Sequence, residues 1–144
     1  MKATQFMTRE VRCILPETSA AEAWRLMHEL GAKHLPVVRE GKLVGVLSDR
    51  DFLGFCTRSR DGSLVFSDVA AGQVMSVDPV VGLEGASVAE LARTMLTHHI
   101  DSLPIVGEGR TLVGLVTSTD LLTLLLESRE ELPMTFRIRP QVSA

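Results

Sequence analysis

A hydroxyl and an aspartate occur together twice in this sequence, three positions apart, and they are the residues best suited to chemistry. Ser48 and Asp51 end the segment GVLSDRD, and Thr117 and Asp120 end the segment GLVTSTD. A hydroxyl can donate to a phosphate oxygen, and a carboxylate can accept hydrogen bonds from both hydroxyls of a ribose. At the start of a helix, where free backbone N–H groups and the helix dipole favour an anion, such a pair fits a ribose phosphate.

A purely structural role is the alternative, and the residues alone favour it. A hydroxyl followed three residues later by an acid is also the pattern of a helix N-cap with its capping-box partner. The glycines that open the two segments, Gly45 and Gly114, have two interpretations as well. They leave room for a sugar or base against a strand, or they let two layers of the fold approach closely. Both alternatives stay open at this point.

The two segments belong to a longer internal repeat. Leu35–Val38 (LPVV) corresponds to Leu103–Val106 (LPIV), and Ser19–Met27 (SAAEAWRLM) corresponds to Ser87–Met95 (SVAELARTM), both at the same offset along the chain. The heptads beginning at positions 45 and 114 lie one position further apart than this common offset, so a single insertion falls in the turn after Val106. Order and spacing agree along the whole unit, which indicates two copies of one fold.

Each copy predicts the element order β-α-β-β-α. The S-x-x-E capping boxes at Ser19 and Ser87 start a helix in each copy. Apolar runs at 35–38 and 43–47, and again at 103–106 and 112–116, predict a hairpin of buried strands. A further helix is expected after each heptad, and a short strand near 12–15 and 79–81. Neither copy buries much surface alone, so we expect an α/β (α+β) fold whose two repeats pack about a pseudo-twofold axis.

The repeat divides the chain into three parts. We predict repeat 1 and its connecting loop over residues 1–63, repeat 2 over 64–128 and a C-terminal tail over 129–144. The connection 57–63 (TRSRDGS) is polar and contains glycine, as is typical of a surface loop. In the tail, Met134, Phe136 and Ile138 alternate with polar residues, which indicates an extended strand with one apolar face. That face needs a partner surface, either on its own domain or on a second subunit.

The composition excludes several classes of function. A net charge of −3 provides no basic excess for binding nucleic acid. No apolar run is long enough to cross a membrane, and the N-terminus lacks the apolar core of a signal peptide. Two cysteines make no disulfide framework. We therefore expect a cytoplasmic chain with neither nucleic acid nor membrane as its partner.

Catalytic and metal sites are not indicated. The adjacent His98 and His99 point about 100° apart on a helix, so they cannot chelate one ion together. Asp49 and Asp51 could suggest paired carboxylates, but the sequence provides neither a cleft nor differing environments for them. No nucleophile elbow, P-loop or dinucleotide fingerprint is present. We expect neither catalysis nor a bound metal.

The ordered series of motifs resembles the CBS domain. Each copy has Met-Thr or Met-Ser at its start, a helix with a buried Met, a Leu-Pro-Val/Ile-Val run and the G-x-x-S/T-x-x-D heptad. Two copies resemble a tandem CBS pair, or Bateman module, over residues 6–55 and 74–128. The resemblance implies a regulatory module, in some cases an energy sensor, that binds an adenosine-containing ligand between its repeats. AMP, ADP and ATP are the usual ligands, S-adenosylmethionine or NAD bind to some members, and no cofactor is required.

The resemblance also implies roles for individual residues. Ser48 and Thr117 would contact phosphate, and Asp51 and Asp120 would hold the ribose diol. The basic phosphate contacts would come from residues before the Leu-Pro step and from the first heptad, namely Lys33, His34 and Arg50. The adenine would rest on the first short strand of each copy, near Cys13–Ile14 and Val80–Val81.

The second copy departs from this pattern, because Asp101 and Ser102 replace Lys33 and His34. An acid there disfavours a polyphosphate unless Lys33 or His34 reaches across the pseudo-twofold axis. We therefore expect unequal clefts.

Three functions remain, of which the third, an enzyme, lacks a catalytic set of residues. The first is a stand-alone nucleotide sensor that changes its own packing or that of a separate target protein. The alternative is a ligand-free scaffold for dimerisation or docking, in which both heptads act only as caps. The leucine-rich helix around Leu121–Leu126 fits a homodimer interface in either case.

Overall fold

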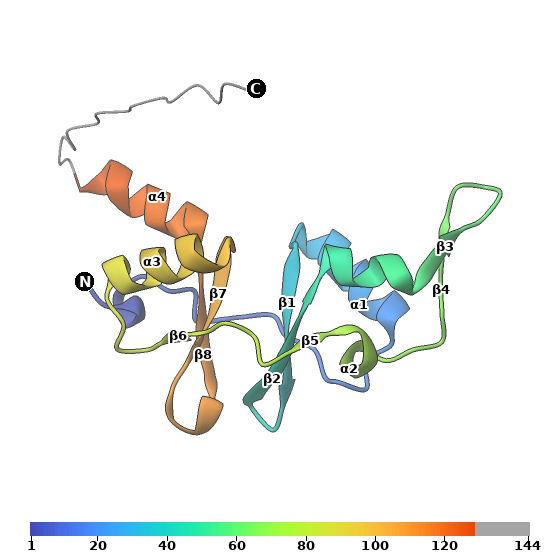
Figure 1. The fold of residues 1–144 in the computed structure, drawn as a ribbon, viewed down its shortest axis with the longest axis horizontal. Helices are drawn as coiled ribbons and strands as arrows, with labels where there is room; N and C mark the ends of the chain where they lie inside the picture. Colours follow the sequence, from blue (N-terminus) through green and yellow to red (C-terminus); the bar gives the residue numbers. More distant parts are fainter. Residues whose placement is uncertain (129–144) are drawn as a thin grey trace, which may run out of the picture.

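The computed structural model describes residues 1–128, which form two halves side by side, each built around a β-hairpin (Figure 1). The first half contains α1 (Ala20–Leu30), β1 (His34–Arg39), β2 (Lys42–Ser48) and the 3₁₀ helix η2 (Asp49–Gly54). The second half contains α3 (Val88–His98), β7 (Ser102–Val106), the 3₁₀ turn η3 (Glu108–Arg110), β8 (Leu112–Thr117) and α4 (Ser118–Glu127). The strand expected in the tail, at Met134–Ile138, lies outside the described residues.

The two hairpins confirm the strands that the apolar runs predict. β1 pairs antiparallel with β2, and β7 pairs antiparallel with β8. Leu35 of β1 and Leu103 of β7 are both buried in their cores. Each hairpin also shifts register at the equivalent place, just before Val38 in β1 and just before Val106 in β7. The internal repeat therefore extends to the irregularities of the backbone.

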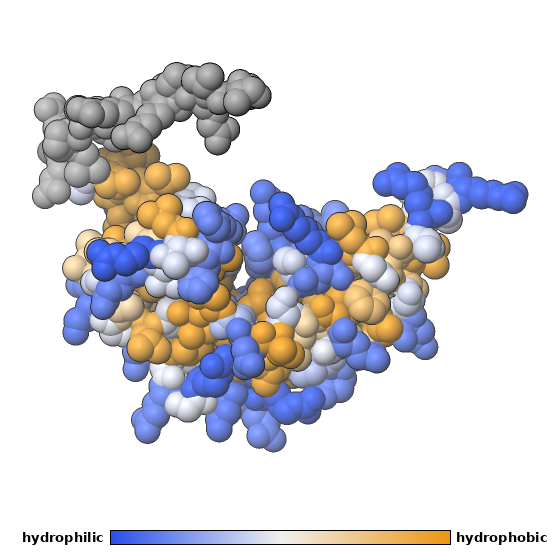
Figure 2. Space-filling model, viewed as in Figure 1, coloured by the Kyte–Doolittle hydropathy of each residue, from blue (hydrophilic) through white to orange (hydrophobic). Residues whose placement is uncertain are grey.

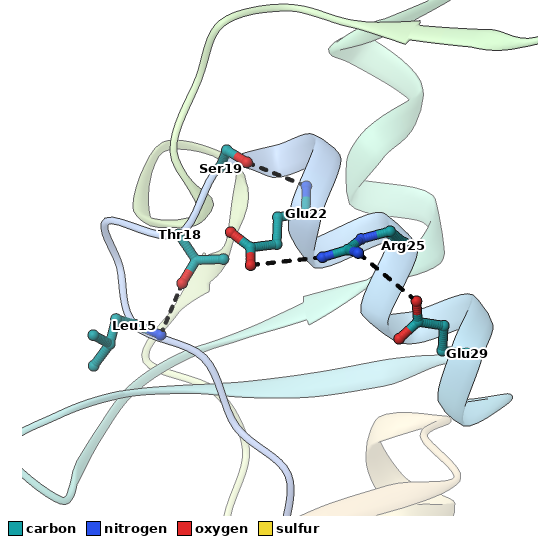
Figure 3. Close-up of polar contacts among 6 residues, drawn as sticks. All are labelled: Leu15, Thr18, Ser19, Glu22, Arg25 and Glu29. Carbon is teal, nitrogen blue, oxygen red and sulfur yellow. Dashed lines mark hydrogen bonds and ion pairs between the residues drawn. The ribbon is translucent and has the colours of Figure 1, made fainter.

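Helix α1 begins at the predicted N-cap. Ser19 Oγ accepts a hydrogen bond from the Glu22 N–H at 3.2 Å. Figure 3 shows this cap together with the exposed ion pairs that Arg25 forms with Glu22 and Glu29 along the same helix. Exposed pairs of this kind add little stability, so the cap and the buried face account for the helix.

Helix α3 begins with a complete capping box. Ser87 Oγ accepts from the Glu90 N–H at 3.3 Å, and the Glu90 carboxylate accepts from the Ser87 N–H at 2.7 Å. The hydrogen bonds from the backbone and side chain of Ser87 lower the pKa of Glu90. The start of this helix is therefore fixed by its own sequence.

The short strands expected before the helices differ from the prediction. Near 12–15 the structure has a single parallel bridge between Ile14 and Val37 rather than a strand. Residues 79–81 lie outside any strand, and β6 (Gly82–Leu83) follows them, parallel to β7. Pro16 and Pro79 lack the N–H that a ladder requires, which restricts pairing on either side of them.

The elements after the two heptads also differ from each other. α4 is an α-helix of 10 residues, as predicted, whereas η2 is a 3₁₀ helix of 6 residues ending at Gly54. The chain then forms a hairpin of β3 (Cys56–Arg58) and β4 (Leu64–Phe66) that projects from the first half (Figure 1). Part of the expected surface loop 57–63 is therefore strand. Glycine disfavours helix continuation, and the β-branched and aromatic residues beyond it favour strands.

Each half has its own core, and a segment from the other repeat completes it. The first core includes Ala71 and Val74 of α2 (Ala71–Val74), and the second includes Ala3, in η1 (Ala3–Gln5), and Met7. Each repeat thus exchanges a segment with the other half. The backbone pairing shows this exchange as well, because β5 (Ser76–Val77) pairs with β2 and Thr8 pairs with Leu115 of β8. The connecting segments therefore run between the halves.

The aromatic residues of the first half belong to its core region. Trp24 of α1 has its ring centroid 5.2 Å from that of Phe52 and 5.6 Å from that of Phe66. Phe52 is fully buried. Trp24 is therefore a packing residue, and its contact with Phe66 of β4 packs the projecting hairpin against α1.

The architecture as a whole is a mixed α/β fold with two copies of one unit about a pseudo-twofold axis, as the sequence predicts. Within residues 1–128, no helix has the length and apolar character needed to cross a bilayer.

Candidate functional site

A cleft between the halves brings Ser48 and Asp51 together in a cavity of about 220 Å³, which we call the first cleft. Ser48 ends β2 and Asp51 is the third residue of η2, so the strand-to-helix turn of the heptad positions both. The apolar residues Pro79, Val80 and Ile100 contribute to the wall. The other lining residues are His34, Val46, Ser76, Ser102 and Pro104. Polar groups from one repeat thus face apolar groups from the other.

The Ser48 hydroxyl is not used as a helix cap. The Ser48 N–H donates to Asp51 Oδ2 at 2.8 Å, which is one half of a capping box. The Ser48 side chain has the placement of a capping box, but its hydroxyl accepts no hydrogen bond from the Asp51 N–H, in contrast to Thr117 and Asp120. The hydroxyl and the second carboxylate oxygen therefore remain able to bind a ligand, and both residues are half-buried.

The second heptad forms the complete cap that the structural interpretation predicts. Thr117 Oγ1 accepts from the Asp120 N–H at 3.3 Å, while Asp120 Oδ2 accepts from the Thr117 N–H at 2.7 Å and from its hydroxyl at 3.0 Å. Thr117 lines a cavity of about 310 Å³, the second cleft, whose lining does not include Asp120. The remaining lining residues are Gly31, Ala32, Lys33, His34, Asp101, Ser102, Leu115, Ser118 and Thr119.

A third cavity of about 560 Å³, which we call the central pocket, shares residues with both clefts. Its lining is mostly charged or polar: Lys33, His34, Ser48, Asp49, Arg50, His99, Ile100 and Asp101. Figure 2 shows hydrophilic residues on both sides of the notch between the halves. Ser48 also belongs to the first cleft, Lys33 also belongs to the second, and His34 lines all three cavities. Basic groups and the Ser48 hydroxyl therefore converge in one place.

His34 reaches across the pseudo-twofold axis. Its Nδ1 lies 3.7 Å from Oδ1 of Asp101 in the other half. Asp101 is the repeat counterpart of Lys33, so an acid and a base occupy equivalent positions on the two sides. The two clefts are chemically unequal for this reason.

The space in front of the two heptad glycines is filled by protein. A Cβ at Gly45 would lie 2.4 Å from Met75 Sδ and 2.8 Å from the Ser76 carbonyl oxygen. A Cβ at Gly114 would lie 2.5 Å from Met7 Sδ. The exchanged segments therefore occupy the room that one of the two interpretations assigned to a sugar or base. Close approach of two layers explains both glycines.

The residues predicted to contact adenine, Cys13–Ile14 and Val80–Val81, lie in different places. Ile14 is buried in the first core, and Val81 lines a separate surface pocket beside α3. Val80 lines the first cleft instead. Successive side chains of an extended segment point to opposite sides, so only one residue of the predicted pair Val80–Val81 lines the cavity.

Several lining residues of the first cleft belong to none of the predicted binding motifs. Ile100, Ser102 and Pro104 come from the second repeat, just before and within β7. Ser102 is the counterpart of His34 when the two repeats are aligned. Aligning the two repeats therefore pairs the start of β1, at His34, with the start of β7, which forms this wall of the cleft.

The first cleft and the central pocket together provide the groups that a nucleotide needs. They combine the Asp51 carboxylate and the Ser48 hydroxyl with apolar surface. Basic side chains, among them Lys33 and Arg50, lie beside the carboxylates of Asp49 and Asp101. Residues 1–128 contain no cluster of three or more His, Cys, Asp or Glu side chains suited to a metal ion. This arrangement can bind a small polar ligand.

Comparison with known proteins agrees with the repeat. The model of the CBS domain family matches residues 3–57 and again residues 71–127. The CBS domain-containing protein YhcV of Bacillus subtilis is 37% identical over 116 residues, which cover 80% of this chain and 79% of YhcV. An inosine-5'-monophosphate dehydrogenase of Korarchaeum cryptofilum is 36% identical over 120 residues. The match spans 83% of this chain but only 23% of that enzyme.

A solved structure has the same fold. The crystal structure of CBSX2 in complex with AMP superimposes with a TM-score of 0.77 at 25% sequence identity. The match covers 90% of this chain and 98% of CBSX2. The similarity therefore extends over both halves and their arrangement.

Proposed function

The chain belongs to the CBS domain family and carries a tandem pair of these domains, and on this premise we propose that it binds an adenosine nucleotide in the first cleft. Asp51 holds the ribose diol, and the Ser48 hydroxyl donates to the phosphate. Lys33, His34 and Arg50 neutralise the phosphate charge. AMP, ADP and ATP are the expected ligands. The protein acts in the cytoplasm as a regulator of energy state without catalysing a reaction.

One observation supports this function above others: Ser48, whose hydroxyl makes no capping hydrogen bond, lines the same cavity as Asp51. A cap alone would leave no reason for an uncapped hydroxyl beside a carboxylate and an apolar wall. The similar structure of CBSX2 holds AMP, which is a ligand of the proposed class.

The signal is expected to reach a second copy of the chain, and through it a separate target protein. Leu96 of α3 and Leu122 and Leu126 of α4 are 76%, 60% and 84% exposed. They flank or line an apolar groove of about 350 Å³ between the two helices, and Figure 2 shows hydrophobic surface over α4. Exposed apolar faces of this kind mark interaction sites. Ile100 lines both this groove and the first cleft, so a ligand contacts the same side chain as the groove.

A ligand-free scaffold is the second candidate function, and the second heptad favours it. The reciprocal bonds between Thr117 and Asp120 account for both residues as a cap. If the first cleft also binds nothing, the exposed helical face would be the functional surface.

A thermal-shift and calorimetric panel with AMP, ADP, ATP, S-adenosylmethionine and NAD, with GMP as the guanine control, separates the two. A ligand at 100 times its Kd adds about 2.7 kcal/mol, which raises Tm by roughly 5–10 °C in a domain of this size. Asp51→Asn should remove the shift. Asp68→Asn, an exposed carboxylate outside the described cavities, is the matched control and should keep it.

A shift with an adenosine ligand that Asp51→Asn removes supports the nucleotide site. No shift with any ligand at millimolar concentration would contradict it and leave the scaffold function. A shift that survives Asp51→Asn would mean that the nucleotide binds somewhere other than the first cleft.

A further inference from the structure

The two clefts draw on a single set of basic side chains. Lys33 and His34 line the central pocket and the second cleft, and His34 also lines the first cleft. Arg50 lines the central pocket beside Ser48. All three come from the first repeat. The second repeat contributes no Lys or Arg to any of these cavities, only His99 and Asp101 besides neutral residues.

The equivalent positions of the two repeats have opposite charge in the same backbone setting. The Lys33 carbonyl accepts from the Asp49 N–H at 3.1 Å, and the Asp101 carbonyl accepts from the Ser118 N–H at 2.8 Å. The two backbones are therefore held in the same way at the start of their heptad helices. Asp101 places a carboxylate where the first repeat places an ammonium group.

We propose, resting on the proposed function, that the module binds one phosphate-bearing nucleotide and that its second cleft takes an uncharged nucleoside. A nucleotide in the first cleft directs its phosphates into the central pocket and occupies Lys33, His34 and Arg50. A second phosphate chain would enter the same pocket beside the first, facing Asp101 with no further Lys or Arg to neutralise it. Like charges at such short range repel each other.

The second cleft retains groups that suit a sugar without phosphate. The carboxylate of Asp101 can accept from ribose hydroxyls, and the hydroxyls of Ser102, Ser118 and Thr119 can donate or accept. Leu115 provides apolar surface in the same cleft. An uncharged adenosine-type nucleoside satisfies these groups without competing for the basic residues.

Isothermal titration calorimetry tests this with ADP and adenosine as the probes. The wild-type chain should bind one ADP at saturation, and a second ADP should bind at least tenfold more weakly. Adenosine titrated into the ADP-saturated protein should bind with one further equivalent. Two ADP per wild-type chain with equal affinity, or exclusion of adenosine by ADP, would overturn the inference and leave the proposed function intact.

A charge reversal provides the matched variant. Asp101→Lys reproduces the first repeat in the second cleft and should raise the stoichiometry from one ADP to two. Glu108→Lys makes the same charge change on an exposed residue beyond the opposite end of β7, and it should leave one ADP. Asp101→Asn, which preserves the shape of the side chain, should strengthen the second ADP at least fivefold, so the test does not depend on the folding of the lysine variant.

The outcomes separate the two levels of the hypothesis. If neither variant changes the binding of a second ADP, Asp101 does not control the second cleft and the inference is wrong. If the wild-type chain binds no ADP, AMP or ATP at all, the proposed function fails and the inference fails with it.

Discussion

His34 and Asp101 meet across the boundary between the halves, with His34 Nδ1 3.7 Å from Asp101 Oδ1. It is the only charge pair joining the halves in the part of the chain that the structure describes. The others lie within α1 or between Arg39 and Glu17 of the first half. Both His34 and Asp101 line the central pocket. A phosphate entering that pocket therefore competes with a carboxylate for the same imidazole.

His34→Ala should weaken ADP binding about tenfold and adenosine binding less than twofold, measured by calorimetry. A hydrogen bond to a charged group contributes about 1.5–3 kcal/mol, and only the ligand with phosphates can make this one. His98→Ala, an exposed histidine at the end of α3, is the control and should bind both ligands as the wild type does. Equal losses for ADP and adenosine would indicate that His34 acts through the shape of the cleft.

The two heptads should respond differently to loss of their hydroxyl. Thr117→Ala removes a hydroxyl that caps α4 and should lower the free energy of unfolding by about 1 kcal/mol. Ser48→Ala removes a hydroxyl that caps nothing and should cost less than about 0.5 kcal/mol. Urea unfolding of the two variants measures this difference. Similar losses would show that Ser48 caps η2 in solution, which would weaken the case for a ligand at its hydroxyl.

Most of the fold could be predicted from the sequence because it depends on local patterns. Caps at Ser19 and Ser87 and the alternation of buried residues in the hairpins are determined within a few positions. The exchange of segments was missed, since the contacts of Ala3 and Met7 with the second core are distant in sequence. Aligning the repeats shows that Met7 and Met75 are equivalent, but it does not show which half each one completes.

Gly45→Ala should destabilise the protein by about 1–3 kcal/mol, the usual cost of overpacking a filled interior. The new Cβ would lie 2.8 Å from the Ser76 carbonyl oxygen, which is backbone of the paired strand β5 and cannot swing aside. Gly54→Ala is the matched control, because a Cβ there meets nothing within 4 Å. Thermal unfolding should show a lower Tm than the wild type for Gly45→Ala and an unchanged Tm for Gly54→Ala. Equal Tm values would mean that β5 separates from β2 at little cost.

The candidate site was predictable where one motif contains it and unpredictable where two repeats meet. Ser48 and Asp51 lie in one heptad, so their proximity follows from a single turn. Ile100 and Ser102 approach them only through packing of the halves. The choice between Val80 and Val81 depends on the direction of one side chain in an irregular segment, which residue types alone do not determine.

Asp61 should titrate well below an ordinary aspartate. Hydrogen bonds from the Ser59 side chain, and then from Ser63, lower its pKa from 3.8 to about 2. Because the folded pKa is the lower one, the ionised form stabilises the β3–β4 turn fully above pH 3.8, and this contribution is lost as the pH falls towards 2. Carboxyl ¹³C NMR should follow the midpoint, and Ser59→Ala should move it up towards 3.8. A wild-type midpoint near 3.8 would show that the turn is open in solution.

The exposed face of α3 and α4 should hold two copies of the chain together. Leu122 and Leu126 are 60% and 84% exposed, so replacing both with Glu should change the stability of one chain by about 0.5 kcal/mol or less each. In a dimer the same carboxylates would be buried against leucines, which is costly for an unpaired charge. Sedimentation velocity should therefore give a dimer for the wild type and a monomer for Leu122→Glu/Leu126→Glu. Leu83→Glu, on β6 and 63% exposed, should remain a dimer. If the wild type and both variants are dimers, the interface lies elsewhere. If the wild type is a monomer, this face binds a different protein instead of a second copy.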